Sequence, residues 1–98
     1  MMAEYKELKH LDKIIHEPAR LMIMVILSSV EEADFLYLLK ATELTRGNLS
    51  SHLSRLEQEG YIVIEKEFVG KTPRTVCRVT KEGETALENY RKQLSGII

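Results

Sequence analysis

Residues 45–81 have the sequence TRGNLSSHLSRLEQEGYIVIEKEFVGKTPRTVCRVTK. Its first part is predicted to be a helix, because leucines recur every three or four positions along one side. Thr45 is a favoured N-cap residue in front of this helix, and Gly60 suits the C′ position behind it. The stretch therefore begins with one helix whose two ends are both marked in the sequence.

From residue 61 onward the spacing changes to that of a β-hairpin. Residues 61–68 are first β-branched and aromatic and then alternate, which is typical of a strand. The residues Gly, Lys, Thr and Pro at 70–73 indicate a turn, and residues 75–80 are predicted to be the return strand. Thr80 suits the N-cap of a last helix over about 81–95.

The residues upstream predict three more helices. Leu8, Leu11 and Ile15 recur at helical spacing and predict a helix over 4–15. Pro18 suits the first turn of a second helix, which is expected to end near residue 29.

Asp34 is a candidate N-cap for a short third helix over 35–41. A short helix, a tight connector and a second helix make a helix-turn-helix, here at about 34–59. With the wing at about 61–80, the predicted fold class is α+β and mainly α. It is a winged helix-turn-helix with a two-stranded β wing, in a single domain over 1–98.

The outward face of the helix that follows Thr45 is small, polar and basic. N-terminal residues of such a helix can reach base edges in the major groove, where Asn pairs with adenine and Arg with guanine or phosphate. A glycine in a helix lowers stability, which is understandable if a side chain there would collide with DNA. The predicted DNA contacts on this helix are Arg46, Gly47, Asn48, Ser50, Ser51, Ser54 and Arg55.

The hairpin tip adds Lys71, Thr72 and Arg74 to the predicted DNA contacts, on the minor groove or on phosphates. The net charge of the chain is only −1, yet residues 45–81 hold seven Lys or Arg and four Asp or Glu. Residues 1–44 hold five Lys or Arg and eight Asp or Glu. The positive charge thus coincides with the predicted helix and hairpin, which favours nucleic acid as the partner.

Several classes of protein do not fit the sequence. The longest apolar run, at residues 21–27, is far shorter than the ~20 residues that span a bilayer, and no secretory signal is seen. A single cysteine, Cys77, fits a reducing cytosol, so we expect a cytoplasmic protein. Cys77 is expected to point inward, although a redox role is the alternative. No catalytic motif stands out, so an enzyme is not expected.

Five segments together resemble a winged-helix family of small prokaryotic and archaeal transcriptional regulators, related to the MarR and ArsR regulators. They are LDKIIHEPARL at 11–21, TRGNLSSHL at 45–53, LEQEGY at 56–61, KTPRT at 71–75 and VTKEG at 79–83. The resemblance runs from residue 11 to about residue 94. It implies a homodimeric, sequence-specific regulator whose terminal helices form the dimer contact, and it places residues 47, 48, 50, 51 and 54 in the major groove.

The chain departs from the metal-sensing ArsR pattern, because no cysteine pair precedes the recognition helix and its three histidines are scattered. No metal or other cofactor is therefore expected. A small apolar effector in a Met- and Tyr-lined cleft near the terminal helices is compatible with the sequence but not required by it. The chain is shorter than typical MarR proteins, which does not favour a large ligand pocket.

Apolar stripes on the two terminal helices favour a homodimer, which would bind a pseudo-palindromic operator in double-stranded DNA. The alternative is that the two end helices pack on each other in a monomer. The predicted dimer residues are Leu8, Leu11, Ile15, Leu87, Tyr90 and Leu94. The competing function is a winged-helix protein-interaction module without DNA binding, which would be expected to expose an apolar patch instead.

Overall fold

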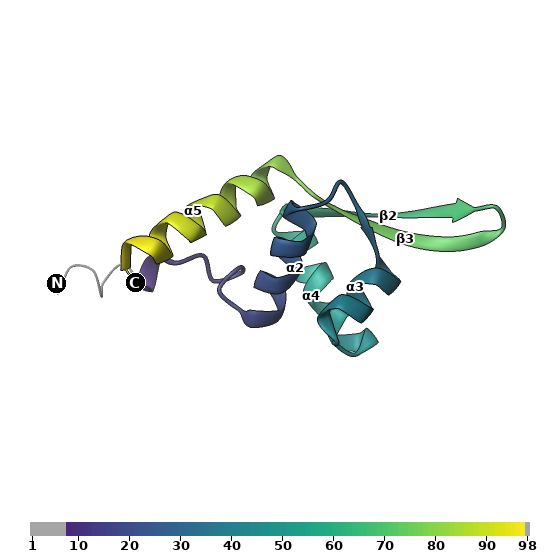
Figure 1. Ribbon diagram of the computed structural model, residues 1–98, viewed down its shortest axis with the longest axis horizontal. Helices are drawn as coiled ribbons and strands as arrows, with labels where there is room; N and C mark the ends of the chain where they lie inside the picture. Colours follow the sequence, from purple (N-terminus) through teal and green to yellow (C-terminus); the bar gives the residue numbers. More distant parts are fainter. Residues whose placement is uncertain (1–7, 98) are drawn as a thin grey trace.

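The computed structural model describes residues 8–97 and confirms the predicted winged-helix class: mostly helical, with one small antiparallel sheet. Three helices, α2, α3 and α4, form the middle of the molecule, while the hairpin β2–β3 projects from one end and α5 from the other (Figure 1). The elements are the 3-10 helix η1 (Leu8–His10), α2 (Pro18–Ser28), β1 (Ala33–Asp34), α3 (Phe35–Thr42), α4 (Arg46–Gln58), β2 (Ile62–Val69), β3 (Thr72–Val79) and α5 (Lys81–Ile97).

The helices begin where the sequence supplies a cap. Asp34 accepts a hydrogen bond from the Tyr37 N–H at the start of α3, and Thr45 accepts one from the Asn48 N–H at the start of α4. These bonds satisfy N–H groups that have no partner inside the helix. Behind α4, Gly60 has a φ of +82°, a conformation that glycine adopts without strain. The predicted caps are therefore confirmed.

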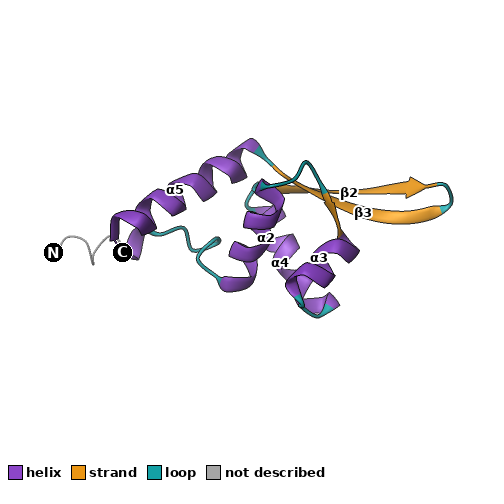
Figure 2. Cartoon of the chain, viewed as in Figure 1, coloured by secondary structure: helices purple, strands orange, loops and turns teal. Residues whose placement is uncertain are grey.

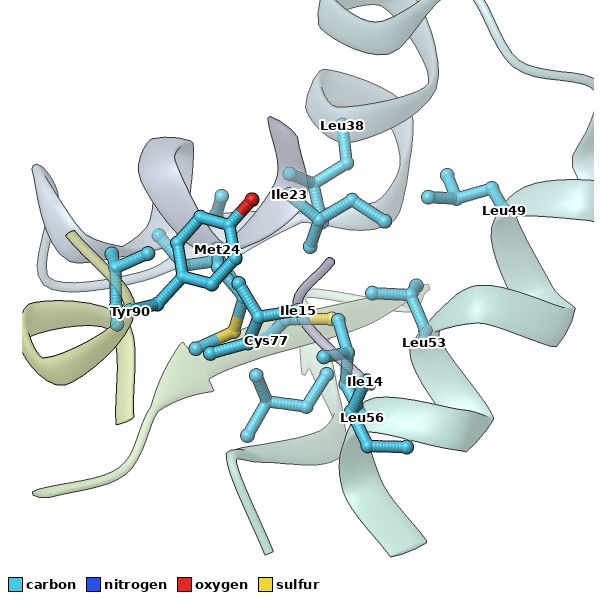
Figure 3. Packing of buried hydrophobic residues seen from close by; sticks show 14 of the residues in the cluster. Ile14, Ile15, Ile23, Met24, Leu38, Leu49, Leu53, Leu56, Cys77 and Tyr90 are labelled. Atoms are coloured by element: carbon cyan, nitrogen blue, oxygen red, sulfur yellow. The ribbon is translucent and has the colours of Figure 1, made fainter. Parts of the chain in front are cut away.

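The core lies between the middle helices and one face of the sheet. Figure 3 shows Leu49, Leu53 and Leu56 of α4 pointing toward Ile23 of α2, with Tyr90 of α5 beside Met24. All of these residues are buried. The leucine stripe of α4 is thus its inner face, as predicted, and the opposite side of α4 is left to solvent.

The predicted helix over 4–15 is wrong for the described residues 8–15. Only η1 is helical there, and turns follow it (Figure 2). The Asp12 carboxylate accepts hydrogen bonds from the Ile14 and Ile15 N–H groups, at 2.8 and 3.1 Å, and so replaces the helical ladder locally. Residues 4–7 lie outside the described residues.

The hairpin is longer and its turn tighter than predicted. β2 and β3 pair from Ile62 with Val79 to Val69 with Thr72, so only Gly70 and Lys71 connect them. Gly70 has a φ of +65°, as the first central position of a two-residue hairpin turn requires. The polar connection after α2 also contains β1, which pairs with β3 and makes the sheet three-stranded in the order β1-β3-β2. A strand of only two residues has no sequence pattern from which it could be predicted.

Four predicted dimer residues belong to the core of a single chain. Leu11, Ile15, Leu87 and Tyr90 are each at most 4% exposed, and Leu87 and Tyr90 keep only the small surface that lines a groove beside α5. They are buried because the N-terminal segment and α5 both pack onto the middle helices, and their part in a dimer stays a prediction. Leu8 is 45% exposed and Leu94 is half-buried, so both remain accessible for contact with a second copy.

Cys77 is fully buried on the core face of β3, as predicted. Burial, with the nearby Glu57 and Asp34 carboxylates, raises the pKa of its thiol to about 11. A buried thiol that stays protonated is a poor nucleophile and a poor redox sensor.

Candidate nucleic-acid interface

The exposed side of α4 brings all seven predicted contact residues together. Arg46, Gly47, Asn48, Ser50, Ser51, Ser54 and Arg55 are all exposed. From Arg46 to Leu56 the helix contains no acidic residue. The face therefore presents hydrogen-bonding groups and two guanidinium groups without a carboxylate among them, except near its C-terminal end.

The start of α4 is held in place by its neighbours. Glu43 ends α3 in a left-handed conformation with a φ of +58°, which turns the chain sharply toward α4. Arg46 lies over the ring of Phe35, with its guanidinium carbon 5.9 Å from the ring centroid, a cation–π distance. Phe35 is therefore a positioning residue that sequence reasoning did not single out.

Gly47 has no structural reason to be glycine within the described residues. A Cβ built on it would meet nothing within 4 Å, and its φ is not positive. The lack of a side chain instead leaves the backbone of the first turn of α4 open to close approach from outside.

His52 is a half-buried packing residue at the edge of α4. Its Nδ1 lies 3.1 Å from the Arg20 guanidinium and 3.9 Å from the Glu17 carboxylate. Arg20 also donates to the Ile14 carbonyl at 2.6 Å, and Glu17 caps α2. This network joins α4 to the start of α2.

A second network joins the N-terminal segment to the end of α4. Tyr61 donates a short hydrogen bond to Asp12, and burial together with that bond raises the pKa of the Tyr61 hydroxyl above its ordinary value. His16 Nδ1 lies 2.8 Å from the Tyr90 hydroxyl of α5. These contacts hold residues 11–17 against the rest of the domain, although these residues do not form a helix.

A groove continues from α4 to the hairpin. It is about 420 Å³ in volume and is lined by residues of α4, by Phe35, and by Ile64 of β2 and Thr75 of β3. The α4 residues are Arg46, Ser50, Leu53 and Ser54. One face of the sheet is therefore continuous with the polar face of α4.

The structure separates the three predicted wing contacts. Lys71 and Thr72 are exposed at the hairpin tip. Arg74 instead lies further down β3, where its guanidinium is 3.4 Å from Glu32, 3.7 Å from Asp34 and 3.6 Å from Glu67. A guanidinium already surrounded by carboxylates is a weaker candidate for a phosphate contact than a free one. The sequence could not show this, because Glu32 and Asp34 reach Arg74 only through β1.

An apolar groove of about 700 Å³ lies between α2 and α5. Leu21 and Val25 line it from α2, and Leu87, Tyr90 and Leu94 line it from α5. Leu94, one of the predicted dimer residues, and Tyr90 both line this groove. Its open apolar wall suits either a second copy or a small apolar ligand.

Neither a metal site nor a membrane span is found in residues 8–97. No group of three or more metal-binding side chains gathers there. None of the helices in that part of the chain combines the length and the apolar character needed to cross a bilayer.

Comparison with known proteins gives a consistent picture. Residues 19–98 match a family model described as a winged helix DNA-binding domain. An uncharacterised protein of Methanocaldococcus jannaschii is 33% identical over 78 residues, which cover 80% of this chain and 85% of that protein.

Among solved structures, a transcriptional regulator homologue from Pyrococcus horikoshii is 34% identical with a TM-score of 0.86. The match covers 94% of this chain and 93% of the other. A MarR-like transcription regulator from Bacillus cereus has a TM-score of 0.71 at 21% identity. That match covers 95% of this chain and 69% of the other and shows a shared fold.

Proposed function

The chain belongs to the winged helix DNA-binding domain family, and on that premise we propose that it is a sequence-specific transcriptional regulator that binds double-stranded DNA as a homodimer. The single observation that carries the proposal is the exposed face of α4. Seven exposed polar, small or basic residues lie on it, and no carboxylate interrupts them before Glu57.

The major groove accommodates an α-helix, and its base edges offer both donors and acceptors. Asn48 is proposed to pair with adenine, and Ser51 with any base edge within reach. Arg46 and Arg55 lie near the two ends of the face and are proposed to hold guanine or the flanking phosphates. Gly47 and the serines keep the helix surface low enough for the bases to approach.

The homodimer is proposed to form over the groove between α2 and α5. Val25 is 46% exposed there, Met22 is exposed beside it, and Leu94 is half-buried on the opposite wall. A two-fold dimer places two copies of α4 on successive turns of one DNA face, about 34 Å apart. The operator would then be pseudo-palindromic.

A protein-interaction module without DNA binding is the second candidate, and one observation favours it. Leu36 and Tyr37 of α3 are both more than half exposed. These two residues belong to α3 and lie outside the polar face of α4, although Leu36 lines a pocket together with Arg46.

A genomic-fragment binding selection with the purified protein, performed at two salt concentrations, tests the proposal. A two-fold-symmetric motif that survives the higher salt is expected. Enrichment without a motif that vanishes as salt rises would indicate non-specific binding, because phosphate contacts alone are salt-sensitive and carry no sequence information. The absence of binding at both salts would favour the interaction module.

A matched pair of variants links the motif to α4. Asn48→Ala should lose about 1–3 kcal/mol of discrimination at one base position and little affinity for non-specific DNA. Asn89→Ala changes an exposed asparagine of α5 and should leave the motif unchanged. Equal losses by Asn48→Ala on specific and non-specific DNA would contradict base contact by Asn48.

A further inference from the structure

The register of the hairpin sorts its side chains onto two chemically different faces. Lys66 pairs with Thr75 and Phe68 pairs with Pro73. Successive residues of a strand point to opposite faces, so these four share the face that Ile64 and Cys77 direct toward the core and α4. The intervening pairs, Glu65 with Val76 and Glu67 with Arg74, occupy the outer face.

The outer face is held together by ion pairs. Beside the three contacts of Arg74, the Arg78 guanidinium lies 3.6 Å from Glu32 and forms an ion pair with Glu65. Two guanidinium groups thus meet four carboxylates, and Val76 is completely buried on the same face. Long arginine stems can cover apolar surface while their charged ends stay paired. An approaching phosphate would encounter a net negative surface here.

The inner face of the hairpin is different in charge and in polarity. It carries no carboxylate, and Lys66 forms no ion pair within residues 8–97. Phe68 is 71% exposed, the highest exposure among the large apolar residues found exposed. Because Ile64 and Thr75 line the groove with Ser50 and Ser54, this face extends the polar surface of α4 without a break.

The spacing along the strand fits the spacing of DNA grooves. Strands rise about 3.3 Å per residue, so Phe68 lies roughly 13 Å beyond Ile64, and Val69 at the end of β2 lies about 17 Å beyond it. Half of a DNA turn of ~34 Å is about 17 Å. With α4 in the major groove, the end of the hairpin reaches the neighbouring minor groove.

We propose that the wing contacts DNA through the Lys66 and Phe68 face, with Lys66 on a backbone phosphate and Phe68 packed into the minor groove. Arg74 and Arg78 are not phosphate contacts in this arrangement. They are positioning residues that hold the hairpin to Glu32 and Asp34, at and just before β1. The inference rests on the proposed DNA-binding function and names the part of the wing that performs it.

The chemistry of the two side chains suits these roles. Apolar side chains contact sugars and base edges in the minor groove, and some insert between base steps. A phenyl ring that is exposed in the free protein gains favourable burial when it does so. An ammonium group that has no carboxylate partner can replace counterions at a phosphate without first breaking an ion pair.

Two matched pairs of variants test the proposal on a duplex that carries the fragment most enriched by the wild-type protein. Phe68→Ser is compared with Val69→Ser, because Val69 is the next residue, is 59% exposed and lies on the outer face. Lys66→Gln is compared with Arg74→Gln. Affinity is measured over a series of salt concentrations, and minor-groove protection is measured by hydroxyl-radical footprinting.

Phe68→Ser is expected to weaken binding about tenfold or more and to remove protection half a turn from the major-groove contact, while Val69→Ser keeps both. Lys66→Gln is expected to lower the slope of log K against log salt by about 0.9, the value for one phosphate. Arg74→Gln should keep that slope. Thermal unfolding of each free variant shows whether it is folded, and both residues of the first pair are exposed enough to tolerate serine.

Identical affinities and footprints for Phe68→Ser and Val69→Ser would overturn the minor-groove role of Phe68. A lower slope with Arg74→Gln but not with Lys66→Gln would assign the phosphate contact to the outer face instead. If Phe68→Ser changed only the sedimentation of the free protein, the ring would be a contact between copies, and the proposal would fail. Failure of the wild-type protein to bind any duplex would instead overturn the proposed function itself.

Discussion

The glycine at position 47 is explained by the function of the protein and not by the packing of the fold. Glycine inside a helix lowers stability relative to alanine, and nothing packs against this position in the chain. Gly47 weakens α4 and contributes nothing to packing, so its presence is best explained by an external surface that must approach the backbone of α4 closely.

We therefore expect Gly47→Ala to have opposite effects on stability and on binding. The free energy of unfolding should not fall and should rise by up to about 1 kcal/mol, because alanine favours the helix. Affinity for operator DNA should fall, because a methyl group would enter the space that the duplex occupies. Chemical denaturation and a binding titration measure the two quantities.

Gly96→Ala is the matched control, since a Cβ at Gly96 also meets nothing within 4 Å and this position lies near the end of α5. Its DNA affinity should equal that of the wild type. Unchanged or tighter DNA binding by Gly47→Ala would contradict a close approach of DNA to the first turn of α4.

At the scale of elements, the junction between the hairpin and α5 is defined by close packing. Thr80 caps α5 by accepting from the Gly83 N–H at 3.0 Å, and its own hydroxyl donates to the Gly60 carbonyl at 2.6 Å. One end of α5 is thus tied to the end of α4. Gly83 is buried at this junction, where there is no space for a side chain.

Gly83→Ala should therefore destabilise the protein although alanine is the better helix former. A Cβ at Gly83 would lie 2.2 Å from the Tyr61 carbonyl oxygen and 2.9 Å from a methyl carbon of Val79. Overpacking of this kind costs about 1–3 kcal/mol. The measurement is the free energy of unfolding, with Gly96→Ala in the same helix as the control, and a Gly83→Ala variant as stable as that control would refute the close contact.

At the scale of the whole molecule, the arrangement of elements leaves one large apolar groove open. The molecule is elongated, at 58 × 26 × 21 Å, because α5 and the hairpin extend in opposite directions (Figure 1). No residue of α4 lines the groove between α2 and α5. A dimer formed there would leave both copies of α4 free for DNA.

Val25→Lys should shift the protein from dimer to monomer, because it places a charge in the centre of that apolar contact. Sedimentation equilibrium gives the mass directly, and operator affinity should fall along with the dimer. Val30→Lys alters a valine of comparable exposure in the connection after α2, outside the groove, and should leave the mass unchanged. A Val25→Lys protein with the same mass as the wild type would exclude this groove as the dimer contact.

The order and type of most elements could be predicted from the sequence, because the signals involved are local. The leucine spacing of α4, the caps at Asp34, Thr45 and Thr80, and Gly60 behind α4 each depend on residues a few positions apart. The exposed face of α4 follows from the same periodicity. For this reason the predicted contacts on α4 all lie together on one exposed surface.

Features that depend on residues distant in the chain could not be predicted from the sequence and became visible only in the packed fold. β1 is too short to have a pattern, yet it brings Glu32 and Asp34 to Arg74 and so removes a guanidinium from the wing surface. Leu11 and Ile15 have the spacing of a helix, but the Asp12 carboxylate bonds the following N–H groups and the two side chains reach the core from turns. Charge and burial are set by neighbours in space, and neighbours in space are fixed only when the strands and helices have packed.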